Sequence, residues 1–447
     1  MPTNTKHYAP CVRYLGTLLA LLALVLSPPT ARAQSSDQRP NAQDLLGNLV
    51  VVAGATRPLP KIAVQPSLES NIEDVTIYNV VRRDLDLCGE FELLPESVVP
   101  GGLLLSDSPV DVKAWAAKGA EAVVKVNGKA LGDGKAELHG IAYFANAGDK
   151  AVFDKSFVVA SINVRDESHR MADALIGALT GTPGGFYSDM TFISGTGKDR
   201  RAYAIDADGH DPEPVSRNGE LVVSSAFGPG QKLYYAASVN NDEYKVLTPD
   251  SPKPLALNVS GSVYGLAFTP ARDQVAAAIA QRDTIEMFAG PDLQHLSRTS
   301  RVPLAMQPTF TPSGKVAFVG EGRWSQRVYV GDKPISPDGL SASSPTFCKH
   351  PDGVRAIFAV GAGMDTDLVA TGESGGSLVR LTQGQGRNNY PACSPDGRLV
   401  AFFSTRKSGE GPGLYIMRID GQRPKRVSTL LGDSLSWARM PEPAAGK

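Results

Sequence analysis

The hydrophobic and polar positions follow two different patterns, one on each side of a Gly/Pro cluster at residues 181–185. Before this cluster, apolar residues recur at helical spacing in two long segments, one between Ser70 and Gly89 and the other over residues 164–179. Alternating segments between them predict strands at residues 122–126, 135–144 and 150–159. After the cluster, the pattern is one of short strands and turns up to the last residues. An α/β part is therefore predicted to precede an all-β part.

The N-terminal part is predicted to be a two-layer α/β domain. Its first strands are expected at residues 49–52 and 62–64, which are short and β-branched. Ser70 and Glu73 match a capping box, which would start the first long helix at Ser70, and Gly89 is placed to end it. A shorter helix is expected between Pro109 and Gly119. Strands and helices in this order favour a sheet covered by helices.

An apolar strand followed by a proline or glycine turn recurs after Phe186 at intervals of about 40 residues. A period of this length, filled with short strands, is typical of a β-propeller whose blades are four-stranded sheets. The apolar positions that mark the repeat are Phe227, Phe268, Phe310, Phe347, Cys393 and Trp437. Six marked strands predict six blades. Because no inner strand precedes Phe192, the strand at Trp437 is expected to complete the blade that begins there.

The N-terminus has the pattern of a cleaved signal peptide. Lys6 and Arg13 precede an apolar run at residues 15–26, which is too short to remain as a membrane span. Small residues at Ala31 and Ala33 then provide a cleavage site. We expect a signal peptide over residues 1–33, the α/β domain over 34–183 with a flexible, partner-binding segment at 34–52, and the propeller over 184–447. This organisation predicts a periplasmic protein without direct membrane insertion.

Composition excludes some classes of partner but does not decide whether the cysteines are free or paired. The formal net charge is -1, so no basic excess points to nucleic acid. The 45 glycines and 33 prolines favour many tight turns. Cys88, Cys348 and Cys393 remain after the signal peptide. Free buried thiols are favoured because cysteine commonly fills apolar cores. A bridge between Cys348 and Cys393, on neighbouring repeats, stays open as the alternative.

Three sequence features could indicate catalysis or metal binding, and each is better explained by a structural role. Residues 372–376 fit the G-x-S-x-G nucleophile elbow, but a strand pattern follows where the elbow needs a helix. Asp206 and Asp208 precede Gly209 as in a calcium loop, but the later ligands of such a loop are missing, which indicates a turn. His139 and His169 are isolated from other ligand types. We therefore predict no catalytic residue, no metal site and no cofactor.

Several segments resemble the TolB family of the Tol–Pal cell-envelope system. The similar segments are residues 60–64, 83–85, 89–91, Trp115 with 119–120, and the junction at 179–194. The order of signal peptide, α/β domain and six-bladed propeller also matches this family. The chain departs from it at Asp189 and Met190, where the family usually has Arg and Ile. The resemblance covers nearly all of the chain after the signal peptide, and the junction is its most specific part.

The resemblance implies a non-enzymatic adaptor that supports outer-membrane integrity and cell division. A Pal-like peptidoglycan-associated lipoprotein would bind the propeller, and a TolA-like inner-membrane protein would bind the N-terminal segment at Leu49, Val50, Val51 and Val52. A monomer is expected. The Pal-like partner is expected at loops that lead into the inner strands, because such loops converge at one mouth of a propeller. The candidate residues are Val263, Tyr264, Met306, Gln307, Ser343, Ser344, Arg387, Asn388, Asn389 and Tyr390. The alternatives are a periplasmic propeller that binds a sugar or peptide, and a propeller accessory to a peptidase.

Overall fold

The N-terminal part is built on a five-stranded mixed sheet with the strand order β2-β1-β3-β4-β5. β1 pairs in parallel with β2 and β3, and the other pairs are antiparallel. The strands are β1 (Lys61–Gln65), β2 (Glu92–Leu93), β3 (Ala122–Gly132), β4 (Lys135–Phe144) and β5 (Ala151–Ala160). Asp133 and Gly134 join β3 to β4, and both have the positive φ that a two-residue hairpin turn requires. The strands predicted at residues 62–64, 122–126, 135–144 and 150–159 are confirmed.

This computed structural model describes residues 41–440 apart from 48, 50–57, 68–70, 102–103, 240–241 and 363. These residues all belong to one compact unit, residues 40–447. The predicted signal peptide lies outside the described residues, and so do Val50, Val51 and Val52 of the predicted first strand. Within the described part, no helix has both the length and the apolar character needed to cross a membrane.

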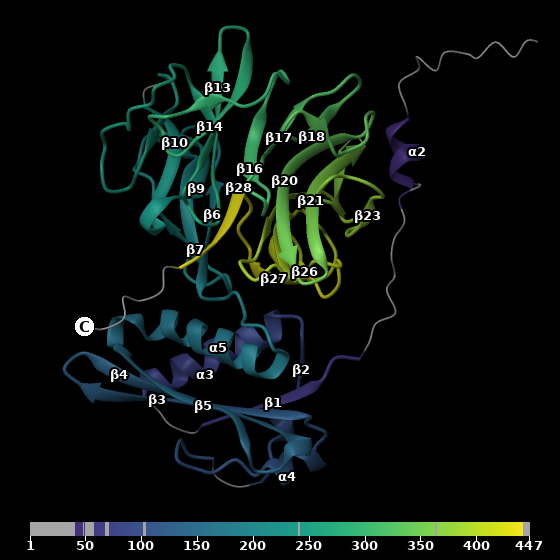
Figure 1. Ribbon diagram of the computed structural model, residues 1–447. Coiled ribbons are helices and arrows are strands. Elements are labelled where there is room, and N and C mark those ends of the chain that lie inside the picture. The colour runs from purple at the N-terminus through teal and green to yellow at the C-terminus, as the bar shows by residue number, and fades with distance from the viewer. Residues whose placement is uncertain are drawn as a thin grey trace, which may run out of the picture. The chain divides into compact units, whose positions relative to one another are not determined.

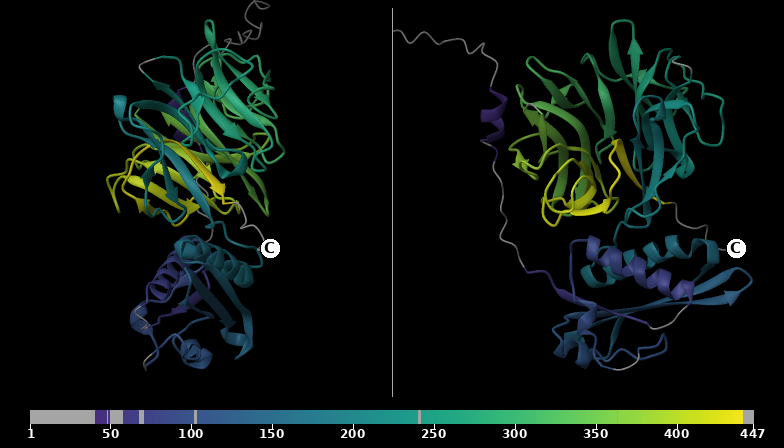
Figure 2. Two further views of the ribbon diagram at one scale, coloured as in Figure 1. Left: turned by 90° about the vertical axis from the view of Figure 1, so that its left-hand side faces the viewer. Right: turned by 180° about the vertical axis from the view of Figure 1, so that it is seen from behind.

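Two long helices cover one face of the sheet, and a short helix lies on the other face (Figures 1 and 2). The long helices are α3 (Ile72–Leu87) and α5 (Val164–Thr180), and the short one is α4 (Val112–Ala117). The side chain of Asn71 caps α3 by accepting a hydrogen bond from the Asp74 amide at 2.7 Å. The capping box predicted at Ser70 is therefore wrong, because Asn71 takes the capping position one residue later. Gly89 follows the helix end with a φ of 73°, as predicted.

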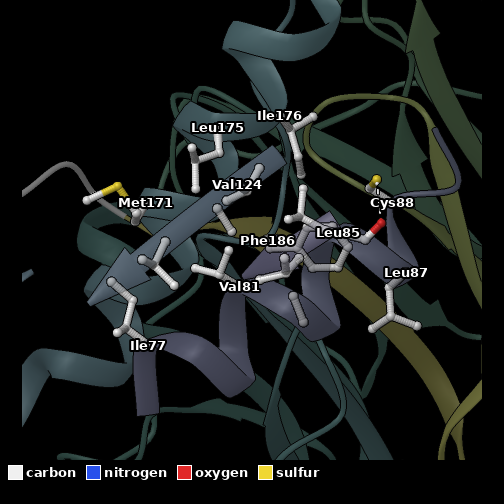
Figure 3. Close-up of a cluster of buried hydrophobic side chains, with 14 of the residues drawn as sticks. Ile77, Val81, Leu85, Leu87, Cys88, Val124, Met171, Leu175, Ile176 and Phe186 are labelled. Carbon is white, nitrogen blue, oxygen red and sulfur yellow. Dashed lines mark hydrogen bonds between the residues drawn. The ribbon is translucent and has the colours of Figure 1, made fainter. Parts of the chain in front are cut away.

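Apolar side chains of α3, α5 and β3 form the core of this part (Figure 3). Ile77, Val81 and Leu85 of α3 are fully buried. Phe186, just after α5, is 1 % exposed and belongs to the same cluster, which continues into propeller residues such as Phe192. The two parts of the chain therefore share one continuous hydrophobic core.

Six antiparallel sheets make up the C-terminal part among the described residues, and they confirm the predicted six-bladed propeller (Figure 1). The first blade contains β6 (Ser188–Ser194), β7 (Arg201–Asp206), β8 (Glu213–Pro214) and the last strand of the chain, β28 (Asp433–Arg439). The second contains β9 (Glu220–Phe227), β10 (Leu233–Val239) and β11 (Lys245–Leu247), and the third β12 (Val263–Phe268), β13 (Val275–Gln281), β14 (Thr284–Gly290) and β15 (Ser297–Arg298). The remaining three blades contain β16 (Met306–Phe310), β17 (Val316–Glu321), β18 (Gln326–Val330) and β19 (Lys333–Pro334); β20 (Ser341–His350), β21 (Gly353–Ala362), β22 (Asp365–Gly372) and β23 (Val379–Arg380); and β24 (Asn388–Cys393), β25 (Leu399–Ser404), β26 (Gly413–Arg418) and β27 (Lys425–Ser428).

The last strand closes the propeller by joining the first blade, in the order β28-β6-β7-β8. Trp437 pairs with Met190 in the antiparallel register, as the sequence predicted. The Trp437 indole also donates a hydrogen bond to the Ser188 hydroxyl at 2.8 Å. At the other end of the strand, Arg200 forms an ion pair with Asp433 at 2.8 Å. β28 therefore covers the edge of β6, which would otherwise be left open.

A disulfide joins Cys348 to Cys393, with the two Cα atoms 5.4 Å apart. The expectation of free thiols is therefore wrong for this pair. Both cysteines lie near the ends of innermost strands, β20 and β24, that contact each other in neighbouring blades. The Cys393 amide also donates to the Thr346 hydroxyl on β20. Cys88 is a free, buried cysteine, in agreement with the expectation.

Candidate functional site

Each of the six innermost strands carries a β-bulge near its beginning. The pairing register shifts at equivalent places in β9, β12, β16, β20, β24 and β28. Four residues at these bulges adopt the left-handed backbone region that non-glycine residues rarely occupy. They are Gln307, Ser344, Tyr390 and Ser434, with φ between 51° and 54°. Bulges re-aim side chains and are over-represented at functional sites. We refer to this end of the propeller as the bulged mouth.

The predicted contact residues lie at or next to these bulges. The bulge of β12 includes Val263 and Tyr264, and the bulge of β16 includes Met306 and Gln307. The bulge of β20 includes Ser343 and Ser344. At or next to the bulge of β24 lie Arg387, Asn388, Asn389 and Tyr390. The Gln307 side chain accepts a hydrogen bond from the Ser344 amide at 2.7 Å, which links two neighbouring blades. Because successive innermost strands contact one another, the structure brings these segments from four blades together.

Large apolar side chains are exposed at the bulged mouth. In the described part of the propeller, the large hydrophobic side chains that remain exposed are Tyr264, Leu304, Met364 and Leu431. Tyr264, Leu304 and Leu431 lie at or just before the beginnings of innermost strands, and Met364 lies in the turn beside Arg387. Sequence reasoning named Tyr264 but missed the other three. All four lie at one end of the propeller, and exposed apolar side chains that gather at one face indicate a surface that binds another macromolecule.

The four predicted residues at the start of β24 differ in how accessible they are. Arg387 is exposed, and its guanidinium donates to the Met364 carbonyl at 2.9 Å. Asn388 is fully buried, and its side chain bonds the Ser404 hydroxyl and the Thr366 carbonyl. Tyr390 is half-buried, and burial raises the pKa of its hydroxyl. Arg387 is therefore available for direct contact, whereas Asn388 and Tyr390 help to hold the bulge.

The described part of the N-terminal segment forms a short helix, α2 (Ala42–Gly47), that sequence analysis did not anticipate. Leu45, Leu46 and Leu49 pack against a buried cluster of the propeller that includes Ile335 and Leu340. Leu45 and Leu49 line a groove of about 420 Å³ together with these two residues. Leu49 is not in a strand, and its predicted neighbours Val50, Val51 and Val52 lie outside the described residues. The segment therefore reaches the propeller through a row of leucines.

The opposite mouth of the propeller faces the α/β part. Arg439, at the end of β28, donates to the Gly184 carbonyl at 3.0 Å. Arg398 donates to the Thr182 carbonyl at 3.0 Å, and Arg418 to the Gly89 carbonyl at 2.8 Å. The turns of the first and last blades at this end are thus occupied by contacts within the chain. None of these contacts involves the bulged mouth.

A buried cluster of charged groups joins α3 and α5 to the first blade. His169 is 3 % exposed, and its Nδ1 lies 2.7 Å from an oxygen of the fully buried Asp84. Burial alone would lower the pKa of His169, but the facing carboxylates, first of all Asp84, raise it to about 10. Burial raises the pKa of Asp84 to about 7. Arg165 completes the cluster by forming ion pairs with Asp206 and Asp208.

This cluster has ligand types that a metal ion could use, and a guanidinium already occupies the place of the cation. The side chains of His169, Asp206 and Asp208 offer ligand atoms within 4.8 Å of one another. Arg165 bonds both carboxylates, with a distance of 2.7 Å to Asp208. The arrangement is that of an ion-pair network between two parts of the fold. Sequence analysis treated these residues separately, because His169 is far from Asp206 along the chain.

Comparisons with known proteins agree with this architecture. Residues 47–141 match the TolB amino-terminal domain. The resemblance to TolB is confirmed. The chain is 29% identical over 218 residues to the Tol-Pal system protein TolB of Thiobacillus denitrificans, covering 49% of this chain and 48% of the relative. It is also 29% identical over 182 residues to the TolB of Methylococcus capsulatus, covering 39% of this chain and 42% of the relative.

A solved TolB structure has the same fold. The crystal structure of TolB from Acinetobacter baumannii matches with a TM-score of 0.68 and 21% identity, covering 86% of this chain and 98% of that one. The chain spans about half the length of the curated TolB relatives in the sequence matches. The relatives are named as components of the Tol-Pal system.

Proposed function

We propose that this chain is a periplasmic, non-enzymatic adaptor of a Tol–Pal system. Its propeller would hold a Pal-like lipoprotein at the bulged mouth, and its N-terminal segment would be presented to a TolA-like protein, in support of outer-membrane integrity and division. The observation that carries the proposal is the exposure of Tyr264, Leu304, Met364 and Leu431 around this mouth. Aromatic residues, methionine and arginine are enriched in the cores of protein interfaces. Because these side chains come from four blades, a protein partner suits this surface better than a small sugar would.

The bulges support this proposal because they hold the backbone in a costly conformation. A non-glycine residue in the left-handed region costs of the order of 1–3 kcal/mol, and such residues cluster at ligand-binding sites. Four of them occur at equivalent positions of the propeller. Hydrogen bonds such as that between Gln307 and the Ser344 amide keep the bulges in place. A rigid surface loses little conformational entropy when a partner binds.

Replacement of Arg387 and Tyr264 by alanine tests the Pal-like site. Both side chains are exposed, so the double variant is expected to keep its melting temperature. If they are hot spots, binding should become weaker by at least about 2 kcal/mol, which corresponds to an increase in Kd of about 30-fold. Isothermal titration with the soluble domain of a Pal-like protein from the same organism measures the change.

Ile162→Ala is the matched control for this experiment. Ile162 is 91% exposed, but it follows β5 in the α/β part and lies away from the bulged mouth. Its replacement is expected to leave partner binding unchanged. If the Arg387 and Tyr264 double variant binds as tightly as the wild type, the partner does not use the bulged mouth.

Deletion of residues 34–47 tests the proposed role of the N-terminal segment. The deletion removes α2 and its leucine contacts with the propeller. Binding of a TolA-like domain is expected to be lost, whereas binding at the bulged mouth is kept, because the two surfaces involve different residues. Both affinities are measured by titration of the same preparation. Undiminished binding of the TolA-like domain would mean that the segment is only a structural part of this protein.

A further inference from the structure

A small cavity lies between the last two complete blades, which are formed by β20–β23 and β24–β27. It measures about 190 Å³. The segment that connects β23 to β24 forms one wall, with Arg380, Thr382, Gln383 and Gln385. Arg406, after β25, and residues of the β26–β27 region form the rest. Two arginines and two glutamines make this lining rich in hydrogen-bond donors.

Arg406 is the residue that distinguishes this cavity. It is only 7% exposed, and its guanidinium lies 4.0 Å from the centre of the Tyr415 ring. Its Nε donates to the Ser404 hydroxyl at 2.9 Å. Its Nη2 is buried and has no hydrogen-bond partner. Among the described residues, no carboxylate lies within ion-pair distance of it. Glu410, an acidic residue that raises the pKa of Arg406, instead accepts from the Arg426 amide.

The other arginine of the cavity, Arg380, has a counter-ion. Arg380 forms an ion pair with the buried carboxylate of Asp367. Asp367 also accepts a hydrogen bond from Thr382 at 3.0 Å, so it is fully engaged on the Arg380 side. Arg406 therefore carries the uncompensated positive charge of this cavity.

A buried charge without a counter-ion is unfavourable, and stacking on an aromatic ring offsets only part of the cost. Burial accordingly lowers the pKa of Arg406. An anion inside the cavity would supply the missing charge beside the guanidinium. A single uncompensated cation suits a monoanion, and the planar guanidinium matches the geometry of a carboxylate. The cavity volume fits a carboxylate group with a few further atoms.

We infer that the cavity between the β20–β23 and β24–β27 blades is a binding site for a small carboxylate, held by Arg406 and flanked by Gln383 and Gln385. Its lining includes none of the residues proposed to contact either protein partner. The carboxylate can belong to a free small acid or to an acidic side chain of a peptide. Binding is expected to stabilise the native state, because only the folded protein assembles this cavity.

The test uses the full mature chain and follows its melting temperature in acetate and in chloride at equal ionic strength. Acetate is expected to raise the melting temperature in a saturable way, and chloride is not. The blocked tripeptide Ac-Ala-Glu-Ala-NH₂ forms a second arm, and the tighter of the two carboxylates identifies the source. Failure of both to raise the melting temperature above that in chloride, or an acetate effect that rises without saturating, would overturn the proposal.

Two variants connect the effect to the cavity. Arg406→Gln should weaken carboxylate binding at least tenfold, and an unchanged response would refute the assignment. Gln383→Glu places a carboxylate on the exposed rim of the cavity, where it would compete with the ligand, so the acetate response should disappear. This second variant decides the question if Arg406→Gln does not fold. Arg298→Gln, which breaks an ion pair with Glu286 on another blade, is the control and should respond like the wild type.

Discussion

A chain that ends after Gly432 is expected to lose the cooperative unfolding of its propeller. This truncation removes β28, and with it the strand that covers the edge of β6. Trp437 is half-buried, so loss of its side chain costs less than the roughly 3–5 kcal/mol typical of a fully buried aromatic. The strand pairing and the ion pair of Arg200 with Asp433 are lost in addition. Thermal unfolding followed by circular dichroism should show a strongly lowered melting temperature.

A second truncation provides the control for the first. A chain that ends after Met440 keeps β28 complete, together with the hydrogen bond from the Met440 amide to the Tyr187 carbonyl. Its melting temperature is expected to match that of the full chain. If the truncation after Gly432 also leaves the melting temperature unchanged, β28 does not close the propeller in solution.

Replacement of His169 by glutamine should be strongly destabilising. At pH 8, which is above the Asp84 pKa of about 7, this carboxyl is charged in the wild type. The variant removes the cation that lowers the pKa of Asp84, so the buried carboxyl must either stay charged without a partner or take up a proton. Breaking a buried pair in this way typically costs about 3–5 kcal/mol. A double variant, Asp84→Asn with His169→Gln, should recover much of the loss because neither side chain is then charged. Urea unfolding of the three proteins measures the free energies.

The pH dependence of stability gives an independent test of this cluster. The folded-state pKa of His169 is about 10 and its ordinary value is near 6.5, so its contribution is fully present below pH 6.5 and is lost as the pH rises through 10. The wild type should therefore lose stability over this range more steeply than the double variant does. His139→Gln is the control. His139 pairs with the exposed Asp154, and such a surface pair contributes at most about 1 kcal/mol.

The parts of the fold that were predictable are those that local periodicity determines. The repeat around Phe227, Phe268 and Phe310 identified the innermost strands, because each blade buries the same alternating face. The closing pair of Trp437 with the first blade followed from counting which strands lacked partners. Helix α5 was visible because its apolar residues recur with a helical period.

The features that sequence analysis missed depend on contacts between distant segments. Asp84, His169 and Asp206 come from three elements, and nothing in their local surroundings indicates that they meet. The pairing of Cys348 with Cys393 required knowing that both lie near the ends of adjacent innermost strands. Helix α2 is short, and its leucines are stabilised by the propeller rather than by its own turns.

The bulges of the candidate site did leave a signal in the sequence that analysis did not use. A polar or aromatic residue followed by proline interrupts three innermost strands, at Gln307, Ser344 and Tyr390. Proline cannot donate a hydrogen bond within a sheet, so inside a sheet it is confined to edge strands, strand starts and bulges. Recurrence of this pair with the period of the repeat would have predicted the bulges. It would not have revealed that Leu304, Met364 and Leu431 are exposed beside them.

The way in which the ring is closed also determines when it can form. Arg439 pairs with Ser188, so the first blade stays incomplete until almost the whole propeller has been synthesised. Contacts over such long chain separations are slow to form, and a blade that waits for its last strand exposes an edge that can pair with other chains. The sheet of the α/β part contains no strand from the C-terminus, so its strands can pair earlier. The period between these two events is when this protein is most vulnerable to aggregation.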